Sequence, residues 1–213
     1  SDGCAELFNK TSFDGYQDIE GLPNGIYRLN LHGLFRVGDC ANKDLYSKDG
    51  VNLQPLSRLA YLYGKSADLT FDTQMLDVLD GLMDEKKHSE DYEYAPGKFG
   101  PNRRAGFTIY NEEGLYDDNT VYVPVTDGTL RIGVAAKGIE FTSSWCVFDD
   151  WSLAYYGSSD AANALWREDF LEKMYIEDGT LIQASLMAPF NEAKDAAESA
   201  ASLEEIIVQY QKM

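Results

Sequence analysis

Alternation of apolar and polar residues over two long stretches is the feature that most constrains the fold of this 213-residue chain. In residues 25–37, the apolar positions at Tyr27, Leu29 and Leu31 are separated by polar ones. A period of two residues places alternate side chains on opposite faces of a β-strand. The stretch therefore predicts a half-buried strand with one solvated face, which is typical of an antiparallel sheet.

The second stretch, residues 121–136, predicts a β-hairpin. Valines alternate with other residues as far as Val125, and the alternation resumes at Leu130 after the pair Asp127-Gly128. Asp-Gly between two such runs favours a tight hairpin turn, because both central residues need a positive φ. Pro124 has no N–H to donate to a ladder, so we expect it at a sheet edge or at a bulge.

The last strand, over residues 145–156, carries an interruption of this pattern. Phe148 lies three residues before Trp151, so a regular strand would place the two aromatic rings on opposite faces. One extra residue at Asp149-Asp150 would bring both rings to the core side, which is the effect of a β-bulge.

The segment between these strands is a long insertion. Residues 58–63 are consistent with a strand, and residues 73–86 carry a helical stripe that includes Met75 and Leu79. Asp72 is the expected N-cap of that helix. Residues 94–106 are rich in Pro and Gly, which indicates a loop.

The composition changes after Gly157, where alanine becomes frequent. Residues 161–213 predict helices: one with Leu165 and Leu171 on its stripe, a second that Pro189 kinks or breaks, and a third that opens at the capping box beginning at Ser202. Their apolar stripes are short, so we expect the helices to pack on each other or on the sheets.

The charge of the chain excludes several kinds of partner. With 36 acidic and 18 basic residues the formal net charge is −18. Nucleic-acid binding needs a basic surface that displaces counterions, and docking on an anionic membrane needs one as well. We therefore expect no nucleic-acid partner. Since no apolar run reaches the roughly 18 residues that cross a bilayer, we also expect no direct membrane insertion.

Sequence motifs of catalysis and metal binding are missing from the chain. The two histidines, His32 and His88, have no catalytic motif around them and are consistent with solvated surface residues. The doublet Asp117-Asp118 indicates a turn. For Asp149-Asp150 three interpretations stay open, namely a bulge, a calcium site and a catalytic carboxylate. We expect no cofactor beyond such a structural calcium.

Aromatic residues with polar neighbours form the candidate ligand site. A sugar ring has an apolar face that matches an aromatic ring, and a hydroxyl edge that matches Arg, Asn and Asp. Core packing is the competing explanation for each of these residues, and it explains Arg36 least well, because Arg36 follows Phe35 on the opposite strand face. The candidate ligand-binding residues are Arg36, Tyr110, Asn111, Tyr116 and Trp145.

Taken together, the runs at residues 17–29, 33–36, 107–116, 121–125, 128–133 and 145–157 resemble the galactose-binding-like β-sandwich modules of surface and polysaccharide-handling proteins of gut bacteria. The similarity covers roughly residues 2–157, and the family often has Asn where this chain has Asp150. The resemblance implies a jelly-roll sandwich that is often non-catalytic and sometimes binds carbohydrate.

The expected organisation is a two-sheet antiparallel jelly-roll sandwich over residues 1–157, with a helix-containing insertion at 66–106, followed by a helical segment at 158–213. The expected function is a non-catalytic binding module of a secreted or surface-anchored protein, with a glycan or cell-surface polysaccharide and neighbouring domains as partners. A structural or adhesive spacer without a small ligand is the first alternative. A hydrolase that uses two carboxylates is the second. The expected location is extracellular or at the cell surface.

Overall fold

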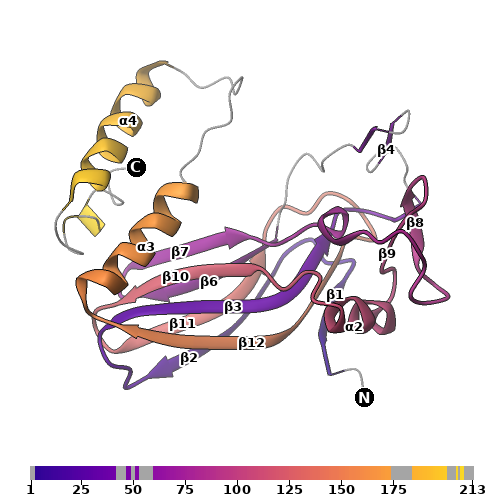
Figure 1. The fold of residues 1–213 in the computed structure, drawn as a ribbon, viewed down its shortest axis with the longest axis horizontal. Coiled ribbons are helices and arrows are strands. Elements are labelled where there is room, and N and C mark those ends of the chain that lie inside the picture. Colours follow the sequence, from indigo (N-terminus) through magenta and orange to yellow (C-terminus); the bar gives the residue numbers. More distant parts are fainter. Residues whose placement is uncertain are drawn as a thin grey trace.

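Two four-stranded antiparallel sheets face each other and form a sandwich (Figure 1). The computed structural model describes residues 3–41, 47–48, 51–52, 60–173, 184–200, 205, 207 and 208. Sheet A has the order β1-β12-β3-β10, and sheet B has the order β2-β11-β6-β7. The mainly-β antiparallel fold followed by helices is confirmed. Its strands are β1 (Ala5–Phe8), β2 (Phe13–Glu20), β3 (Gly25–Arg36), β6 (Ala60–Ser66), β7 (Leu69–Gln74), β10 (Asn119–Val125), β11 (Thr129–Ala136) and β12 (Trp145–Gly157).

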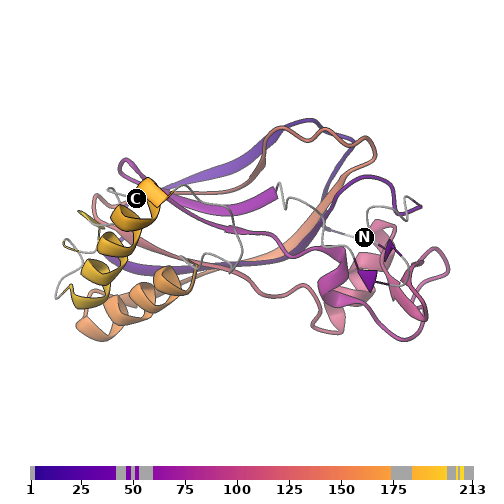
Figure 2. The same cartoon turned by 90° about the horizontal axis from the view of Figure 1, so that it is seen from above.

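The other elements lie at the two ends of the sandwich. The short hairpins and α2 lie at one end, and α3 and α4 lie at the other (Figure 2). No helix among the described residues is long and apolar enough to cross a membrane. The elements outside the two four-stranded sheets are β4 (Ser47–Lys48), β5 (Val51–Asn52), the 3-10 helix η1 (Val78–Gly81), β8 (Tyr92–Ala95), β9 (Lys98–Gly100), α2 (Arg104–Glu112), α3 (Asp160–Lys173) and α4 (Ala184–Ser199).

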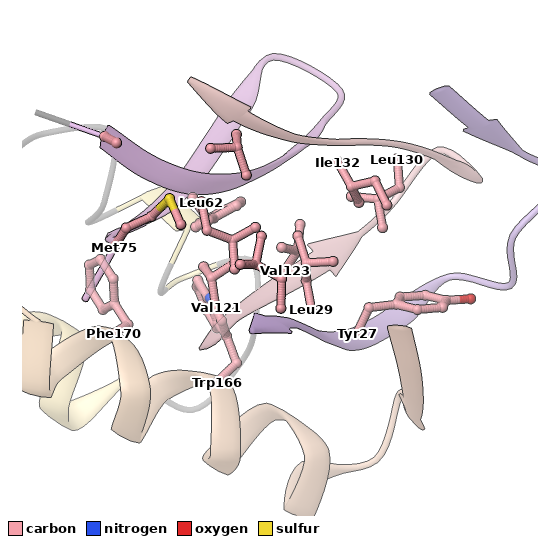
Figure 3. Packing of buried hydrophobic residues seen from close by; sticks show 14 of the residues in the cluster. Tyr27, Leu29, Leu62, Met75, Val121, Val123, Leu130, Ile132, Trp166 and Phe170 are labelled. Carbon is pink, nitrogen blue, oxygen red and sulfur yellow. The ribbon is translucent and has the colours of Figure 1, made fainter. Parts of the chain in front are cut away.

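The apolar face of each predicted strand lines the core between the sheets (Figure 3). Leu29 of β3 lies opposite Val121 of β10 in the ladder, and both side chains are buried. Leu130 and Ile132 enter the same core from β11 of the other sheet. Leu153 of β12 is only partly buried and packs against this core. Burial of alternate side chains from both sheets is what the period-two pattern requires.

Two local features of the strands are also as the sequence indicates. Pro124 pairs with Ile26 in β10, the edge strand of sheet A, where its missing N–H is tolerated. The ladder between β12 and β3 is interrupted after Asp149, and Asp150 has a φ of 50°. This bulge turns Trp151 onto Phe148, with ring centroids 5.8 Å apart in an edge-on arrangement.

The helix predicted over residues 73–86 is wrong, since only η1 forms there. β7 runs to Gln74, and the chain then follows the end of β3, where the N–H of Phe35 donates to the carbonyl of Leu76 at 2.8 Å. Asp77, rather than Asp72, caps the short helix. Met75 enters the sandwich core, whereas Val78 enters a second apolar cluster, so the stripe is divided between two cores.

Helix α3 closes one edge of the sandwich. Trp166 meets Phe71 of β7 edge-on at 5.7 Å between ring centroids, and Phe170 stacks on Trp166, also with 5.7 Å between the centroids. Figure 3 shows Trp166 pointing from α3 toward Val121 of β10, the edge strand of the facing sheet. The helix therefore shares the sandwich core, although it lies beyond the boundary expected at residue 157.

Helix α4 packs on α3 and continues through Pro189, at which we expected a kink or a break. Ala197 of α4 is buried in the core cluster that contains Trp166. Packing of the tail helices on each other and on the sheets is what their short stripes require. The third predicted helix, from Ser202 onward, falls mostly outside the described residues.

Candidate functional site

The five residues predicted to bind a ligand gather where the insertion covers the outer face of sheet A. Tyr110, Tyr116 and Trp145 belong to one buried cluster, which we call the insertion cluster. The Tyr110 and Tyr116 ring centroids are 6.3 Å apart, and the Arg36 guanidinium carbon lies 5.4 Å from the Trp145 centroid. The cluster consists of Cys4, Leu34, Cys40, Val78, Tyr94, Phe107, Tyr110, Tyr116, Trp145 and Val147.

Arg36 is 4% exposed and bonds to the chain around it. Its Nε donates to the carbonyl of Gly38 at 3.2 Å, and Nη1 donates to Oδ1 of Asn102 at 2.6 Å. Nη2 donates to the carbonyl of Ser143 at 3.1 Å. Since a buried guanidinium is stable only when its donors are satisfied, these bonds tie three loops to the end of β3.

The aromatic residues of the set also have internal partners. The Tyr110 hydroxyl donates to Oδ2 of Asp91 at 3.2 Å, and the Tyr116 hydroxyl donates to the carbonyl of Val78 at 2.7 Å. Burial is the main cause that raises the pKa of both tyrosines above the ordinary value. Trp145 is buried as well. These rings face the protein interior in this structure, and their binding of a ligand stays a prediction.

Asn111 is the one member of the set that reaches solvent. Its side chain bridges two others, with Oδ1 2.6 Å from Nδ1 of His32 and Nδ2 donating to Oδ2 of Asp150 at 2.8 Å. This polar group connects β3, α2 and the bulge of β12. Among the described residues, no group of three or more His, Cys, Asp or Glu side chains is placed to hold a metal ion.

A groove lies on the other side of the sandwich, at the edge that α3 does not close. Its volume is about 340 Å³, at the lower end of the usual range for small-molecule sites. The strands that border it are β2, β11 and β12 (Figure 1). We call it the open-edge groove, and its lining residues are Gly15, Tyr16, Gln17, Ile132, Phe148 and Trp151.

The strand pairing explains why this edge is open. β1 covers β12 only as far as the pair Ala5 and Phe148, so β12 is the edge strand from the bulge onward. Trp151 is 39% exposed there, and Tyr16 on β2 is 54% exposed. Trp166, at the edge closed by α3, is 1% exposed. Two edges of one sandwich thus carry aromatic residues, and at one of them the rings remain accessible.

A cation stacks on the exposed ring of Tyr16. The guanidinium carbon of Arg131 lies 3.8 Å from the centroid of the Tyr16 ring. The same guanidinium forms a bidentate ion pair with Asp18, with Nε 2.7 Å from Oδ1 and Nη2 3.0 Å from Oδ2. The hydrogen bonds from Arg131 hold the pKa of Asp18 below its usual range, and the bond to Asp18 raises the pKa of Arg131.

A second hollow of about 260 Å³ lies beyond this ion pair, on the outer face of sheet B. Asp18 and Arg131 line it together with Glu20, Lys65 and Thr129. The strand β2 borders both hollows, the first at Gly15, Tyr16 and Gln17 and the second at Asp18, Ile19 and Glu20.

Sequence reasoning did not find Tyr16 or Trp151 as binding residues. Both occupy strand positions at which the alternation pattern indicates only a face, and Trp151 was expected on the core side next to Phe148. What exposes these rings is the absence of a strand or helix over this edge, and that follows from the tertiary arrangement. The signal available in the sequence was the bulge at Asp149-Asp150, since bulges often lie beside functional sites.

Comparison with known proteins gives little further guidance. No family model matches the chain. No curated protein is significantly similar to it. One similar solved structure is that of TmCBM61 in complex with beta-1,4-galactotriose, with 12% identity, a TM-score of 0.32, and coverage of 71% of this chain and 70% of that chain. At this level of similarity the function has to be inferred from the groove itself.

Proposed function

We propose that this chain is a non-catalytic carbohydrate-binding module that holds a glycan in the open-edge groove. The observation that carries the proposal is the accessible ring of Trp151 at an apolar groove, which the edge strand β2 borders at Gly15, Tyr16 and Gln17. The C–H face of a pyranose ring matches an aromatic face, whereas its hydroxyl groups need hydrogen-bonding partners at the rim. The Gln17 amide in the groove lining provides such a partner.

The site is built mostly on strands, which favours binding with little rearrangement. Trp151 rests edge-on against Phe148, and Tyr16 is stacked by Arg131, so both rings are supported before a ligand arrives. A shallow site of this size gains little over water, so we expect a Kd of roughly 0.1–1 mM.

A non-catalytic role agrees with the chemistry of the lining. Glycoside hydrolysis uses a pair of carboxyl groups that flank the scissile bond. None of the six described residues that line the open-edge groove carries a carboxylate, an imidazole or a thiol. The groove can thus hold a sugar, but its lining offers no pair of carboxyl groups for hydrolysis of a glycosidic bond.

The resemblance to galactose-binding-like modules supports the same proposal. Such modules belong to large surface proteins, so we propose an extracellular or cell-surface location, with neighbouring domains of a longer protein as further partners. An epitope-tagged chain in the native host, probed on intact cells with and without permeabilisation, tests this. Signal that needs permeabilisation would contradict the proposed location.

A glycan array followed by calorimetry with the best oligosaccharide tests the binding function. Trp151→Ala should weaken binding about tenfold or more, because the stacking surface is lost. Tyr156→Ala is the matched control, since Tyr156 is 43% exposed on the same strand but packs on Tyr122, away from the groove. Equal losses in both variants, or no binding to any glycan, would contradict the proposal, and the second outcome would favour the spacer function.

A further inference from the structure

We infer that Asn111 positions the groove residue Trp151 from the outer face of sheet A, through its hydrogen bond to Asp150 in the bulge of β12. The inference rests on the proposed function and adds to it a positioning residue and a role for α2. Asn111 is not part of the groove lining, so it acts through the bulge and not on the ligand.

The first step is the backbone of the bulge. The ladder between β12 and β3 stops after Asp149 and resumes at Ser152, so Asp150 and Trp151 lie outside it. Asp150 has a φ of 50°, a left-handed conformation that a residue other than glycine adopts at an energetic cost. Such a conformation persists where surrounding contacts determine it. The position of Trp151 therefore depends on contacts other than the ladder.

The second step is that the bulge is held from both faces of sheet A. On the groove side the Trp151 ring meets Phe148 edge-on, with 5.8 Å between the ring centroids. On the outer side Oδ2 of Asp150 accepts a hydrogen bond of 2.8 Å from Nδ2 of Asn111. Because Asp150 and Trp151 are neighbours in the chain, fixing the carboxylate on the outer face limits where the ring can lie on the inner face.

The third step is that Asn111 itself has a defined position. Its Oδ1 lies 2.6 Å from Nδ1 of His32 on β3. Since the amide nitrogen of Asn111 donates to Asp150, its oxygen is the acceptor, and Nδ1 of His32 is the donor. The preceding residue of α2, Tyr110, is fully buried in the insertion cluster, and its hydroxyl donates to the carbonyl of Phe99 at 3.1 Å. The insertion and β3 together thus hold Asn111 over the bulge.

The fourth step separates positioning from folding. The hydrogen bond between Asn111 and Asp150 is accessible to water, since the Asp150 side chain is 61% exposed. An exposed polar contact contributes little to the stability of a fold, because water competes for both partners. It can still select between backbone conformations of similar energy in a segment that the ladder does not fix. We therefore expect loss of this bond to move Trp151 while the urea midpoint of unfolding stays nearly unchanged.

Fluorine NMR of a chain labelled with fluorotryptophan tests the positioning without any ligand, and Trp151→Phe identifies the resonance of Trp151. Asn111→Asp places a second carboxylate against Asp150 and should broaden or split that resonance. Calorimetry with the neutral oligosaccharide that gives the strongest array signal should then show an affinity lowered by about three- to tenfold.

The double variant Asn111→Asp/Asp150→Asn exchanges donor and acceptor and should restore both the resonance and the affinity, since asparagine also tolerates a positive φ. Asn24→Ala is the matched control. It removes an exposed asparagine whose Nδ2 donates to the carbonyl of Thr126 at 2.7 Å, and it should change neither readout.

A Trp151 resonance that Asn111→Asp leaves unchanged would overturn the inference, and so would a double variant as impaired as the single one. A changed resonance with an unchanged affinity would also overturn it, because Asn111 would then have no effect on the groove. A fall in the urea midpoint as large as that of Trp166→Ala would give Asn111 a structural role instead. Absence of binding to every oligosaccharide by the wild-type chain would overturn the proposed function, while the resonance would still report whether Asn111 positions Trp151.

Discussion

Arg131 lies over the ring of Tyr16 at 3.8 Å from the ring centroid, and it does so while both oxygens of Asp18 hold its guanidinium. The three side chains come from two strands paired in sheet B, where Arg131 is the ladder partner of Asp18. The arrangement fixes an exposed tyrosine on the outer face of β2, the edge strand that borders the open-edge groove. A ring that is already ordered costs less conformational entropy when a ligand binds to it.

Removing this support should weaken glycan binding without removing any contact to the sugar ring itself. Arg131→Ala frees the Tyr16 ring, and ordering one side chain costs enough to lower the affinity for a neutral glycan by about two- to tenfold. Calorimetry with a neutral oligosaccharide measures this change. Tyr16→Ala should lose at least as much, whereas a Tyr16→Ala variant that binds like the wild type would remove Tyr16 from the site.

The edge of the sandwich that α3 closes should contribute to the stability of the fold and not to ligand binding. Trp166→Ala removes a fully buried ring from the contact with Phe71 and should lower the free energy of unfolding by about 3–5 kcal/mol. Leu165→Ala, at the neighbouring exposed position of α3, should cost less than about 1 kcal/mol. Urea denaturation provides both values, and equal losses would contradict the described packing of α3.

Arg36→Ala separates the two candidate sites. The substitution leaves the carbonyls of Gly38 and Ser143 without their donor, so the free energy of unfolding should fall by about 2–4 kcal/mol. Glycan affinity, measured at a temperature where the variant is folded, should stay unchanged if the ligand binds in the open-edge groove. A stable variant that loses binding would instead place the ligand site at the insertion cluster.

Alkaline pH should destabilise the chain through the tyrosines of the insertion cluster. Burial raises the pKa of Tyr94 and Tyr116 in the folded state, whereas in the unfolded chain both ionise near pH 10. The stabilising contribution of each is therefore complete below about pH 10 and is lost as the pH rises above it, by up to about 1.4 kcal/mol per pH unit and tyrosine.

Urea denaturation between pH 9 and pH 11 measures this loss, with Tyr116→Phe as the comparison. The buried thiols also have a raised pKa and add their own pH dependence, so the difference between wild type and Tyr116→Phe isolates one tyrosine. The variant should show the smaller slope. Identical slopes would mean that Tyr116 ionises in the folded chain as it does in the unfolded one.

Much of the fold could be predicted from the sequence because its determinants are local. The alternation around Leu29 and Leu130 fixes which face of each strand is buried, and Pro124 indicates an edge. The bulge could be predicted because Phe148 and Trp151 are out of phase for a regular strand. In each case the constraint spans only a few neighbouring residues.

The wrong predictions concern segments whose apolar side chains are divided between two surroundings or are covered by a distant part of the chain. The stripe at residues 73–86 has helical spacing, yet Met75 packs between the sheets and Val78 packs under the insertion. In the tail, Leu165 was expected on the buried stripe, but the core contact is made by Trp166. Tertiary packing decides which residues a distant segment covers. The local pattern of apolar residues does not contain this information.

The same reason applies to the candidate site. The residues predicted to bind were chosen as aromatic rings with polar neighbours, and the insertion buries Tyr110, Tyr116 and Trp145. The aromatic ring of Trp151 is accessible because β1 is short and leaves that part of β12 uncovered. Residue type could be used to propose a sugar-binding surface, but accessibility required the arrangement of the edge strands.

The fluorescence of Trp151 tests the central claim most directly. Trp145 and Trp166 are buried, so Trp151 is the indole that an aqueous quencher such as acrylamide can reach. The neutral oligosaccharide with the strongest array signal, at saturation, should protect this indole and lower the quenching constant, and Trp151→Phe should remove both the quenching and the protection. Calorimetric binding of the oligosaccharide with no change in the quenching of Trp151 would contradict binding in the open-edge groove.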